Sequence, residues 1–522
     1  MKVRNVAAAM TVAGAVLLCL WGPVSCNVMH DLPLGRHSWK QGDCLALAQR
    51  FLGDGNWNIL DPRGQSRIPV DGKVNAELPL TAYLAAVGAR ALGARRLEEI
   101  YRLLTLLFSS LAPLSLFVYV WRRTASVAAA LFPLAFLASC PVFLYYATGF
   151  HPDPAAFGVL MLGLMLLLAE RADRPAGWQT LAGIGAMTLG SLMKLSLAPY
   201  LLVPAVLALH RSRQGGHVVG VRTLTSIPRA VRAALVGSGL LLVGELVYLK
   251  IRAIAYGPTF FTAAPHPFRS LSHLASVAER MWNGWLPDLF TPPQLLVLGV
   301  CTLALVVWGF SGRKPDELTI ASGVAALVMV SLFVLFGKQF AWHDYYAIAT
   351  FYPLAGLLVV RLSLELWEIG NTSRVASARP LTALVFLAVG VAMALPVGER
   401  VTARTSPWWR NQVAWLGEAR ELLDGCGRPC RGEVAVLGSK PPNLALTHLN
   451  RQGYVLGPDL DGGLGVPALG SVDGVARYMR EHNVRVLVVK QTLLNRLPAG
   501  DVERWFAVAA RRPEARVLLL RE

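Results

Sequence analysis

Charged residues are scarce in this chain, since Asp, Glu, Lys and Arg make up only 16% of its 522 residues while hydrophobic types make up 54%. That balance excludes an ordinary soluble globular protein and predicts a polytopic α-helical membrane protein. Acidic residues are fewer than basic ones, 32 against 50, which leaves a net charge of +18. The excess Lys and Arg concentrate in short loops between apolar runs, as the positive-inside rule expects, so the charge argues against a nucleic-acid partner.

Cysteine is also rare, with seven residues in the chain. Three of the seven lie in apolar runs, at Cys19, Cys140 and Cys301, where a thiol behaves as a small hydrophobe. Cys426 and Cys430 have no His pair near them, which argues against zinc and leaves them candidates for a disulfide in an oxidising compartment. Cys44 could be free. The chain lacks a Gly-x-x-x-x-Gly-Lys phosphate loop, an internal repeat and a low-complexity linker.

Apolar runs fill the chain up to residue 396, and most are long enough to span about 30 Å of hydrocarbon. After the N-terminal run of residues 1–21 they lie near 79–93, 101–120, 125–146, 154–170, 177–192, 195–209, 231–250, 292–311, 318–337, 345–362 and 380–396. We expect the first run to be an uncleaved signal anchor rather than a cleaved signal peptide. The sequence therefore predicts a transmembrane domain over residues 1–396 with a cytoplasmic N-terminus.

Loop charges predict the topology. The stretch from His210 to Arg232 carries several arginines and no acid, which places it in the cytoplasm. Other basic loops are predicted to lie in the cytoplasm as well, those with Arg171, Arg174, Arg313, Lys314, Arg374 and Arg379. The chain after residue 397 is then external, and an odd number of crossings, about 11, is required. We expect the short run 79–93 to be re-entrant or interfacial, although Arg95 and Arg96 then lie externally; an extra break near Pro141 is the alternative.

Residues 397–522 predict a small soluble, extracytoplasmic α/β domain, because the hydropathy falls there. The residue pattern predicts strands at Gly432–Leu437, Val484–Val489 and Arg516–Leu520 and a helix at Val475–Glu481. Pro, Gly and Asp cluster between Gly457 and Gly470 and predict a long loop.

The first external loop, residues 24–78, holds the strongest candidate chemistry. Ser38 and Gln41 have the spacing of a capping box, which predicts a helix after Ser38. Apolar residues then repeat on one side of this helix, as in a helix that lies in a membrane interface, at Leu45, Ala48 and Leu52. Asp43 lies off that side, and Glu77 precedes Pro79 at the start of the next apolar run.

Asp43 and Glu77 are therefore candidate catalytic carboxylates at a membrane surface. The alternative is that both are ordinary loop residues that contact solvent and have no role in catalysis. A transferase needs a carboxylate to accept a proton from an acceptor hydroxyl or amine while an anionic phosphate leaves. Trp39, Lys40 and Gln41 accompany Asp43 as candidate substrate-binding residues. Cations that could contact the phosphate share the loop, at Arg36, Lys40, Arg63, Arg67 and Lys73.

Other polar groups interrupt the apolar runs. His151 and Asp153 open one run, where Asp153 either caps a helix or lines a site. Lys194 lies either in a turn between spans or against a phosphate. A further set of candidate substrate contacts lies at an external helix start, where the aromatic residues could instead form an interfacial belt, at Lys338, His343, Tyr345 and Tyr346.

Five motifs together resemble the membrane glycosyltransferases of the dolichyl-phosphate-mannose protein mannosyltransferase and aminoarabinose transferase type. They are Arg36-His37-Ser38-Trp39-Lys40-Gln41-Gly42-Asp43, Ala48-Gln49-Arg50-Phe51, Glu77-Leu78-Pro79-Leu80, His151-Pro152-Asp153-Pro154 and His343-Asp344-Tyr345-Tyr346. The resemblance implies the GT-C fold, a polyprenyl-phosphate sugar donor, transfer that usually inverts the anomeric centre, and Asp43 as the catalytic carboxylate. Glu77 and Asp153 would line the site and could touch the acceptor or a divalent cation; no cofactor is certain. Leu78 stands where aminoarabinose transferases have a Lys, so the phosphate-binding cation must come from elsewhere.

The sequence thus predicts a glycosyltransferase in a bacterial inner membrane. It would move a sugar from a polyprenyl-phosphate carrier to a glycan, lipid or protein acceptor on the external face, among membrane lipids. A transporter or lipid flippase is the first alternative, although apart from Glu245 few charges interrupt the middle of the apolar runs. Two further alternatives are a polymerase or ligase of another membrane family and a structural membrane scaffold.

Overall fold

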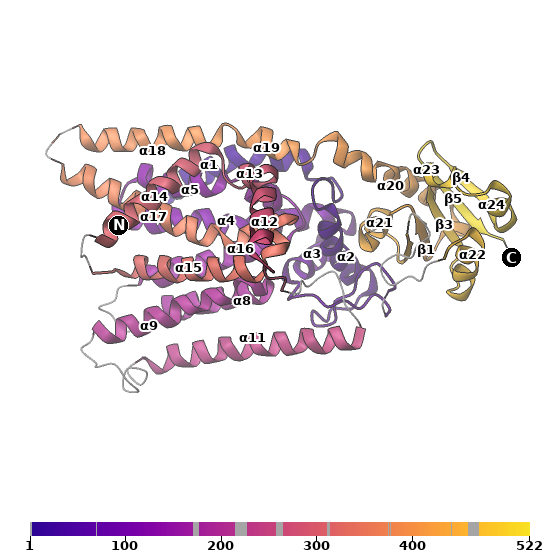
Figure 1. Ribbon diagram of the computed structural model, residues 1–522, viewed down its shortest axis with the longest axis horizontal. Coiled ribbons are helices and arrows are strands. Elements are labelled where there is room, and N and C mark those ends of the chain that lie inside the picture. The colour runs from indigo at the N-terminus through magenta and orange to yellow at the C-terminus, as the bar shows by residue number, and fades with distance from the viewer. Residues whose placement is uncertain are drawn as a thin grey trace.

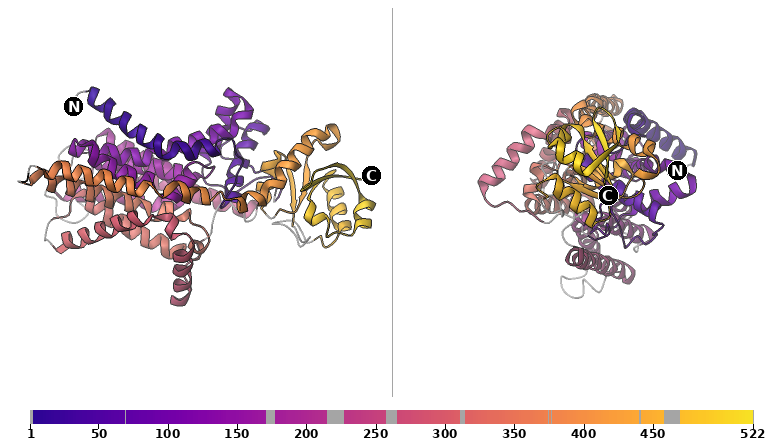
Figure 2. Two further views of the ribbon diagram at one scale, coloured as in Figure 1. Left: turned by 90° about the horizontal axis from the view of Figure 1, so that it is seen from above. Right: turned by 90° about the vertical axis from the view of Figure 1, so that its right-hand side faces the viewer.

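In the computed structural model the chain forms a long helical bundle with a small α/β domain at one end (Figure 1). The structure describes residues 3–521 except 69, 171–176, 215–226, 257–264, 311–313, 374, 376, 440 and 458–468. The bundle helices lie along the long axis of the molecule, and the N-terminus lies toward the end opposite the α/β domain. The view from above shows the same elongated shape, and the second view looks at the molecule from the end that carries the α/β domain (Figure 2).

Apolar helices build the bundle, and all of them except α11 contribute to one buried core, while α11 packs beside α8 through a separate small cluster around Ile184 and Val231. They are α1 (Val3–Val28), α4 (Leu97–Thr124), α5 (Val127–Ala138), α6 (Pro141–Ala147), α7 (Pro152–Ala169), α8 (Trp178–Met193), α9 (Leu202–Gln214), α11 (Arg229–Tyr256), α14 (Pro292–Phe310), α15 (Glu317–Leu335), α17 (Tyr352–Thr372) and α18 (Ala378–Ala394). Among the described residues, seven helical segments are long and apolar enough to cross a membrane, or up to eight if the bent α5–α6 pair is one span. The predicted polytopic helical class is confirmed, and the crossing number of about 11 stays a prediction.

Two local features bear on the predicted topology. The run at 79–93 forms α3 (Leu80–Leu92), whose 13 residues extend only about 20 Å, too short for 30 Å of hydrocarbon. Its buried alanines pack against α2 (Ser38–Asp54) and the start of α4. The chain also breaks before Pro141, where α5 and α6 meet at 74°. The predicted break is therefore present near Pro141, and the placement of 79–93 as a re-entrant or interfacial segment stays a prediction.

Short elements gather at the end of the bundle that carries the α/β domain. They are η1 (Ala94–Arg96), η2 (Leu195–Leu201), α12 (Leu271–Gly284), α13 (Leu286–Leu289), η3 (Gly337–Ala341) and α16 (Tyr346–Thr350). In Figure 1, α12 lies across the direction of the long helices, and in Figure 2 it projects from the bundle. These elements join the long helices where the first loop lies.

The C-terminal domain is a five-stranded mixed sheet with helices, in the order β2-β1-β3-β5-β4. Helix α19 (Val397–Ala403) continues the candidate span of α18 and packs in the bundle core. The elements of the domain are α20 (Pro407–Cys426), η4 (Arg428–Cys430), β1 (Val434–Leu437), α21 (Pro442–Leu449), β2 (Gly453–Leu456), α22 (Val472–Glu481), β3 (Val486–Lys490), α23 (Gln491–Leu494), α24 (Ala499–Trp505), β4 (Phe506–Arg511) and β5 (Ala515–Leu520). Strand β1 pairs in parallel with β2 and β3, and β5 pairs antiparallel with β3 and β4.

Most predictions for this domain agree with the structure. The three predicted strands correspond to β1, β3 and β5, and the predicted helix lies within α22. Sequence reasoning missed β2, which has only four residues, and β4, whose mostly exposed residues lack the alternation of a half-buried strand. The disulfide between Cys426 and Cys430 forms, and Cys44 is free and buried. Most of the predicted loop between Gly457 and Gly470 lies outside the described residues.

Helix α2 departs from its expected setting. The capping box is wrong, because the residue before the helix, His37, adopts φ 54° and no side chain caps the helix. Leu45 and Ala48 pack against α3, so they do not face lipid as an interfacial helix would. A neighbouring side of α2 packs on α21 so closely that a Cβ on Gly42 would lie 2.9 Å from Leu444 Cα. Glycine at this position therefore lets the C-terminal domain reach the first loop.

Candidate active site

Most of the predicted site residues meet at the domain end of the bundle, where α2, the start of α7, the α8–η2 junction and the segment 342–346 converge. They form three groups: Asp43 with Lys40, the ion pairs of Lys194, and a cluster of aromatic and imidazole rings. The polar positions that interrupt distant apolar runs are thus brought together by the fold.

Asp43 is a buried carboxylate, 2% exposed, on the second turn of α2. Its Oδ1 accepts a hydrogen bond of 3.0 Å from Asn443 Nδ2, which belongs to α21 of the C-terminal domain. Its Oδ2 has no hydrogen-bond partner among the described residues. Burial raises the pKa of Asp43 to about 6, while the charge of Lys40 and the bond from Asn443 act in the opposite direction. The free oxygen and the raised pKa suit a carboxylate that accepts a proton near neutral pH.

Lys194 joins the other two predicted carboxylates. It follows α8, and its Nζ lies 3.3 Å from Glu77 Oε2 and 3.4 Å from Asp153 Oδ1. Glu77 Oε1 also accepts a bond of 2.9 Å from the backbone N–H of Leu195, which fixes the start of η2. Because Leu78 replaces the lysine expected after Glu77, Lys194 brings an ammonium group to the same carboxylate from another part of the chain.

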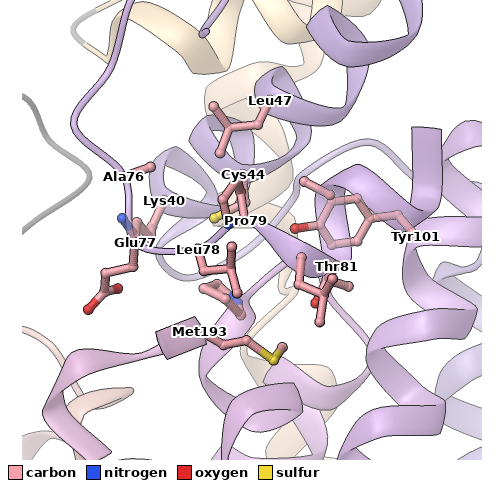
Figure 3. A pocket seen from close by; sticks show the side chains of 13 residues that line it. Lys40, Cys44, Leu47, Ala76, Glu77, Leu78, Pro79, Thr81, Tyr101 and Met193 are labelled. Atoms are coloured by element: carbon pink, nitrogen blue, oxygen red, sulfur yellow. The ribbon is translucent and has the colours of Figure 1, made fainter. Parts of the chain in front are cut away.

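A small cavity of about 30 Å³ lies beside this ion pair. Figure 3 shows Lys40 and Glu77 on one side of it and Tyr101 on the other, with Cys44 and Leu78 between them. Lys40 is 6% exposed, and its charge acts on Asp43. The cavity therefore brings a second lysine close to the carboxylates.

An aromatic and imidazole cluster borders the carboxylates. The ring of Tyr345 lies 4.5 Å from that of His151 and 5.4 Å from that of His37, centre to centre. Trp39 packs 5.8 Å from His343. The cluster consists of the side-chain rings of His37, Trp39, Tyr146, His151, His343, Tyr345 and Tyr346. Lys194 Nζ lies 5.9 Å from the centre of the Tyr346 ring, which connects the cluster to the ion pairs.

Two predicted residues do not join these groups. Gln41 bonds instead to the turn between α6 and α7, since its Nε2 donates to Tyr145 Oη at 3.3 Å and its Oε1 accepts from Phe150 N at 3.2 Å. Lys338 is exposed on η3, where its backbone N–H donates to His266 O. The structure thus gives Gln41 a structural contact and places Lys338 at the surface.

Sequence reasoning missed a buried network around Asp344, which is fully buried. Its carboxylate accepts bonds from Arg404 and, at 2.6 Å, from Tyr146 Oη, and Arg36 Nε lies 3.4 Å away. Burial opposes ionisation of Asp344, but Arg404, His37 and Arg36 together hold its pKa well below the usual range. The network fixes the segment 342–346 against the start of α2. Asp344 is part of a motif noted above, whereas nothing in the sequence pointed to Arg404 or Asn443.

Most of the predicted loop cations are engaged elsewhere. Arg36 pairs with Asp344, Arg63 with Asp61 and Asp71, and Arg67 with Asp71 and Glu433, while Lys73 lies over the Tyr256 ring. Of that set within the described structure, Lys40 is the one whose charge acts on Asp43. Lys40 and Lys194 are therefore the cations that line the site.

The residues present do not fit a divalent cation. Within the described part of the chain, no group of three or more His, Cys, Asp or Glu side chains is placed to hold a metal ion. Glu77 and Asp153 face Lys194 instead, whose ammonium group already balances their charge. We therefore derive no step through a metal.

The fold matches solved membrane proteins over nearly its whole length. ArnT from Cupriavidus metallidurans in the apo state has a TM-score of 0.60 and 14% identity, with 98% of each chain covered. The same protein bound to undecaprenyl phosphate gives 0.58 and 14%, covering 98% of this chain and 97% of ArnT. An oligosaccharyltransferase from Archaeoglobus fulgidus gives 0.51 and 14%, covering 92% of this chain and 68% of that enzyme.

At the level of sequence, no family model and no curated protein matches the chain. The likeness therefore rests on the arrangement of the helices and on the α/β domain that follows them. On that evidence the chain is a multi-pass membrane protein with the GT-C fold of membrane glycosyltransferases, as its motifs predicted.

Proposed function

We propose that this protein is a glycosyltransferase that moves a sugar from a polyprenyl-phosphate carrier to a cell-envelope acceptor on the external face of a bacterial inner membrane. The observation that carries the proposal is Asp43, a buried carboxylate with one unbonded oxygen. Two lysines line the same site, Lys40 and Lys194. The similarity of the fold to ArnT, which was solved bound to undecaprenyl phosphate, supports a polyprenyl-phosphate donor.

In the proposed reaction Asp43 Oδ2 accepts the proton of the acceptor hydroxyl or amine as that group attacks the anomeric carbon. The bond between this carbon and the phosphate oxygen breaks on the opposite face, so the anomeric centre inverts. The sugar is then bonded to the acceptor, and the polyprenyl phosphate leaves with one additional negative charge. Asn443 holds the other carboxylate oxygen and so fixes the direction of Oδ2.

Lys194 and Lys40 would stabilise the charge that develops on the leaving phosphate. Two preorganised ammonium groups in a site of low polarity are worth far more than the same groups in water. In this reading Glu77 and Asp153 hold Lys194 in place rather than contact the sugar. The rings of Trp39, Tyr345 and Tyr346 provide flat apolar surfaces of the kind that sugars pack against, and His343 adds polar nitrogen atoms.

Transfer can be separated from transport in one assay. The purified protein, reconstituted in liposomes, is incubated with envelope acceptors and a membrane lipid extract in which the sugar of the polyprenyl-phosphate lipids is radiolabelled. We expect the label to move to the acceptor while free polyprenyl phosphate appears in equal amount. A flippase would instead move the intact labelled lipid across the bilayer, and this result, without cleavage of the glycosyl-phosphate bond, would refute the proposal.

A further inference from the structure

A second and larger cavity, of about 430 Å³, lies apart from the Lys194 ion pairs. Its walls come from the end of α1, from α4, from the turn between α6 and α7, and from α19 with the start of α20. It shares no lining residue with the small cavity beside Glu77. Its volume lies within the range of about 300–1,000 Å³ that is usual for ligand sites.

The cavity lies where candidate membrane spans end. Val24 and Val28 belong to the last turns of the span Val6–Val28, and Val401 to the last turn of the span Ala378–Ala403. Both spans end near the C-terminal domain, next to each other, in Figure 1. The lining that these helices contribute is mixed, with Val24, Val28 and Val401 beside Asn27 and Thr402. Because both spans end here, we expect this wall to lie where lipid headgroups meet hydrocarbon.

Arg102 of α4 provides the inner wall and is 5% exposed. Its Nη1 donates to Thr148 O at 2.5 Å and its Nη2 to Asp31 O at 2.7 Å, and both acceptors are neutral backbone carbonyls. Its Nε has no hydrogen-bond partner, and one face of the guanidinium lies 4.1 Å from the centre of the Phe150 ring. Among the described residues, no carboxylate lies within ion-pair distance of Arg102.

Asp31 and Glu98 act on Arg102 through their charges, but neither carboxylate contacts it, so its buried charge is only partly balanced, which is costly. The cavity beside it is large enough for an anion. Arg410 lies at the rim, exposed, and its Nε donates to Thr405 O at 3.0 Å. Asp31 also lines the cavity and acts on Arg102 as the opposing charge. Two guanidinium groups against one carboxylate leave the polar wall positive overall.

We propose that this cavity binds the phosphate of an anionic lipid headgroup, with Arg102 facing the phosphate, Arg410 closing the rim, and the first carbons of the acyl chains against Val24 and Val401. The site does not depend on the proposed transfer reaction. An occupant would also brace the start of α2, because Gln41 and Tyr145, which bond to each other, both line the cavity.

Lipid binding to the purified full-length protein tests this site. The protein is stripped of lipid and exposed to vesicles of dioleoylphosphatidylglycerol or dioleoylphosphatidylcholine, and retained lipid is counted by native mass spectrometry. We expect phosphatidylglycerol to be retained and phosphatidylcholine to be lost. Arg102→Gln should reduce retention about tenfold, as expected for loss of a charge-assisted hydrogen bond, and Arg95→Gln, an exposed arginine of η1 at the same end of the bundle, should leave it unchanged.

Thr402→Trp, at an exposed position that lines the cavity, fills the cavity without removing a charge, and it decides the test if Arg102→Gln does not fold. Equal retention of both lipids, or retention of phosphatidylglycerol by Thr402→Trp at the wild-type level, would overturn the proposal. A further arm uses inorganic phosphate. If phosphate binds with the same dependence on Arg102 while phosphatidylglycerol does not, the cavity takes a free anion and the lipid assignment is wrong.

Discussion

Asn443 Nδ2 donates a hydrogen bond of 3.0 Å to Asp43 Oδ1, across 400 residues of sequence and between the C-terminal domain and the first loop. The same amide accepts a bond of 3.0 Å through its Oδ1 from the backbone N–H of Ser66. Asn443 therefore has a fixed orientation, with its donor toward the carboxylate. The candidate base is held by a domain that follows all the apolar runs, so the site is complete only when that domain is docked.

Loss of this bond should slow transfer while the fold remains. We expect Asn443→Ala to lower kcat/KM by about tenfold to a hundredfold, since a bond to a charged group contributes about 1.5–3 kcal/mol. Asn495→Ala, in the same domain but bonded only to Gln491, serves as the control. Unchanged activity in Asn443→Ala, measured with the labelled lipid donor, would remove Asn443 from the positioning of the base.

The rate should depend on pH through Asp43. A base must be ionised, and because burial raises its pKa to about 6, kcat/KM should rise with pH through about 6 and then level off. The charge of Lys40 lowers this pKa, so Lys40→Met should move the acid limb to higher pH. Lys73→Met, in the same loop, should leave the limb in place. A limb that does not move in Lys40→Met would contradict this electrostatic account.

Lys194 should matter both for folding and for catalysis, and the two effects can be separated. Lys194→Met leaves Glu77 and Asp153 buried without their cation, which should cost about 3–5 kcal/mol of stability. Adding Glu77→Gln removes one of the two charges and should restore part of that stability, measured by thermal unfolding in detergent. Transfer should stay low in the double variant. Recovery of transfer together with stability would show that Lys194 has a purely structural role.

Much of the site could be predicted because its residues break local patterns. Asp153, Lys194 and His343 stand at the edges of apolar runs, where a polar group is costly unless it is used, and Asp43 lies in the first loop within a motif of Trp, Lys and Gln. The concentration of Lys and Arg in loops of one side then predicted that these edges lie on the same face of the membrane. Leu78 stands where a lysine was expected, and the structure brings Lys194 to Glu77 in its place. The sequence could not say which cation would replace the missing lysine.

The rest depended on tertiary contacts. The capping box failed because the Gln41 amide bonds to Tyr145 and Phe150, which a local pattern cannot foresee. Nothing in the sequence near Arg404 or Asn443 indicates a role, because their partners, Asp344 and Asp43, lie 60 and 400 residues away in the chain. Glu245, which had favoured a transporter, accepts a bond from the backbone of Leu78 at 3.1 Å and so helps to fix the loop.

The disulfide offers a test of the predicted external position of the C-terminal domain. In intact cells we expect Cys426 and Cys430 to resist a thiol reagent until they are reduced, because disulfides persist in oxidising compartments. Cys26, exposed near the C-terminal end of α1, which is predicted to be external, provides the free thiol for comparison. Cys426→Ser with Cys430→Ser should cost about 2 kcal/mol or more. Labelling of both cysteines without reduction would place the domain in the cytoplasm.

Asp43→Asn tests the central claim most directly, because it keeps the shape of the side chain and removes its basicity. The purified variant should fold. Burial raises the pKa of Asp43 to about 6 in the wild type, so its ionisation lowers stability as the pH rises from the usual range of a carboxyl to about 6, and the variant lacks that cost. With the labelled polyprenyl-phosphate sugar donor, transfer should fall by about 10²–10⁴-fold, while Asp54→Asn, at the end of α2, retains it. Transfer by Asp43→Asn at the wild-type rate would contradict the account.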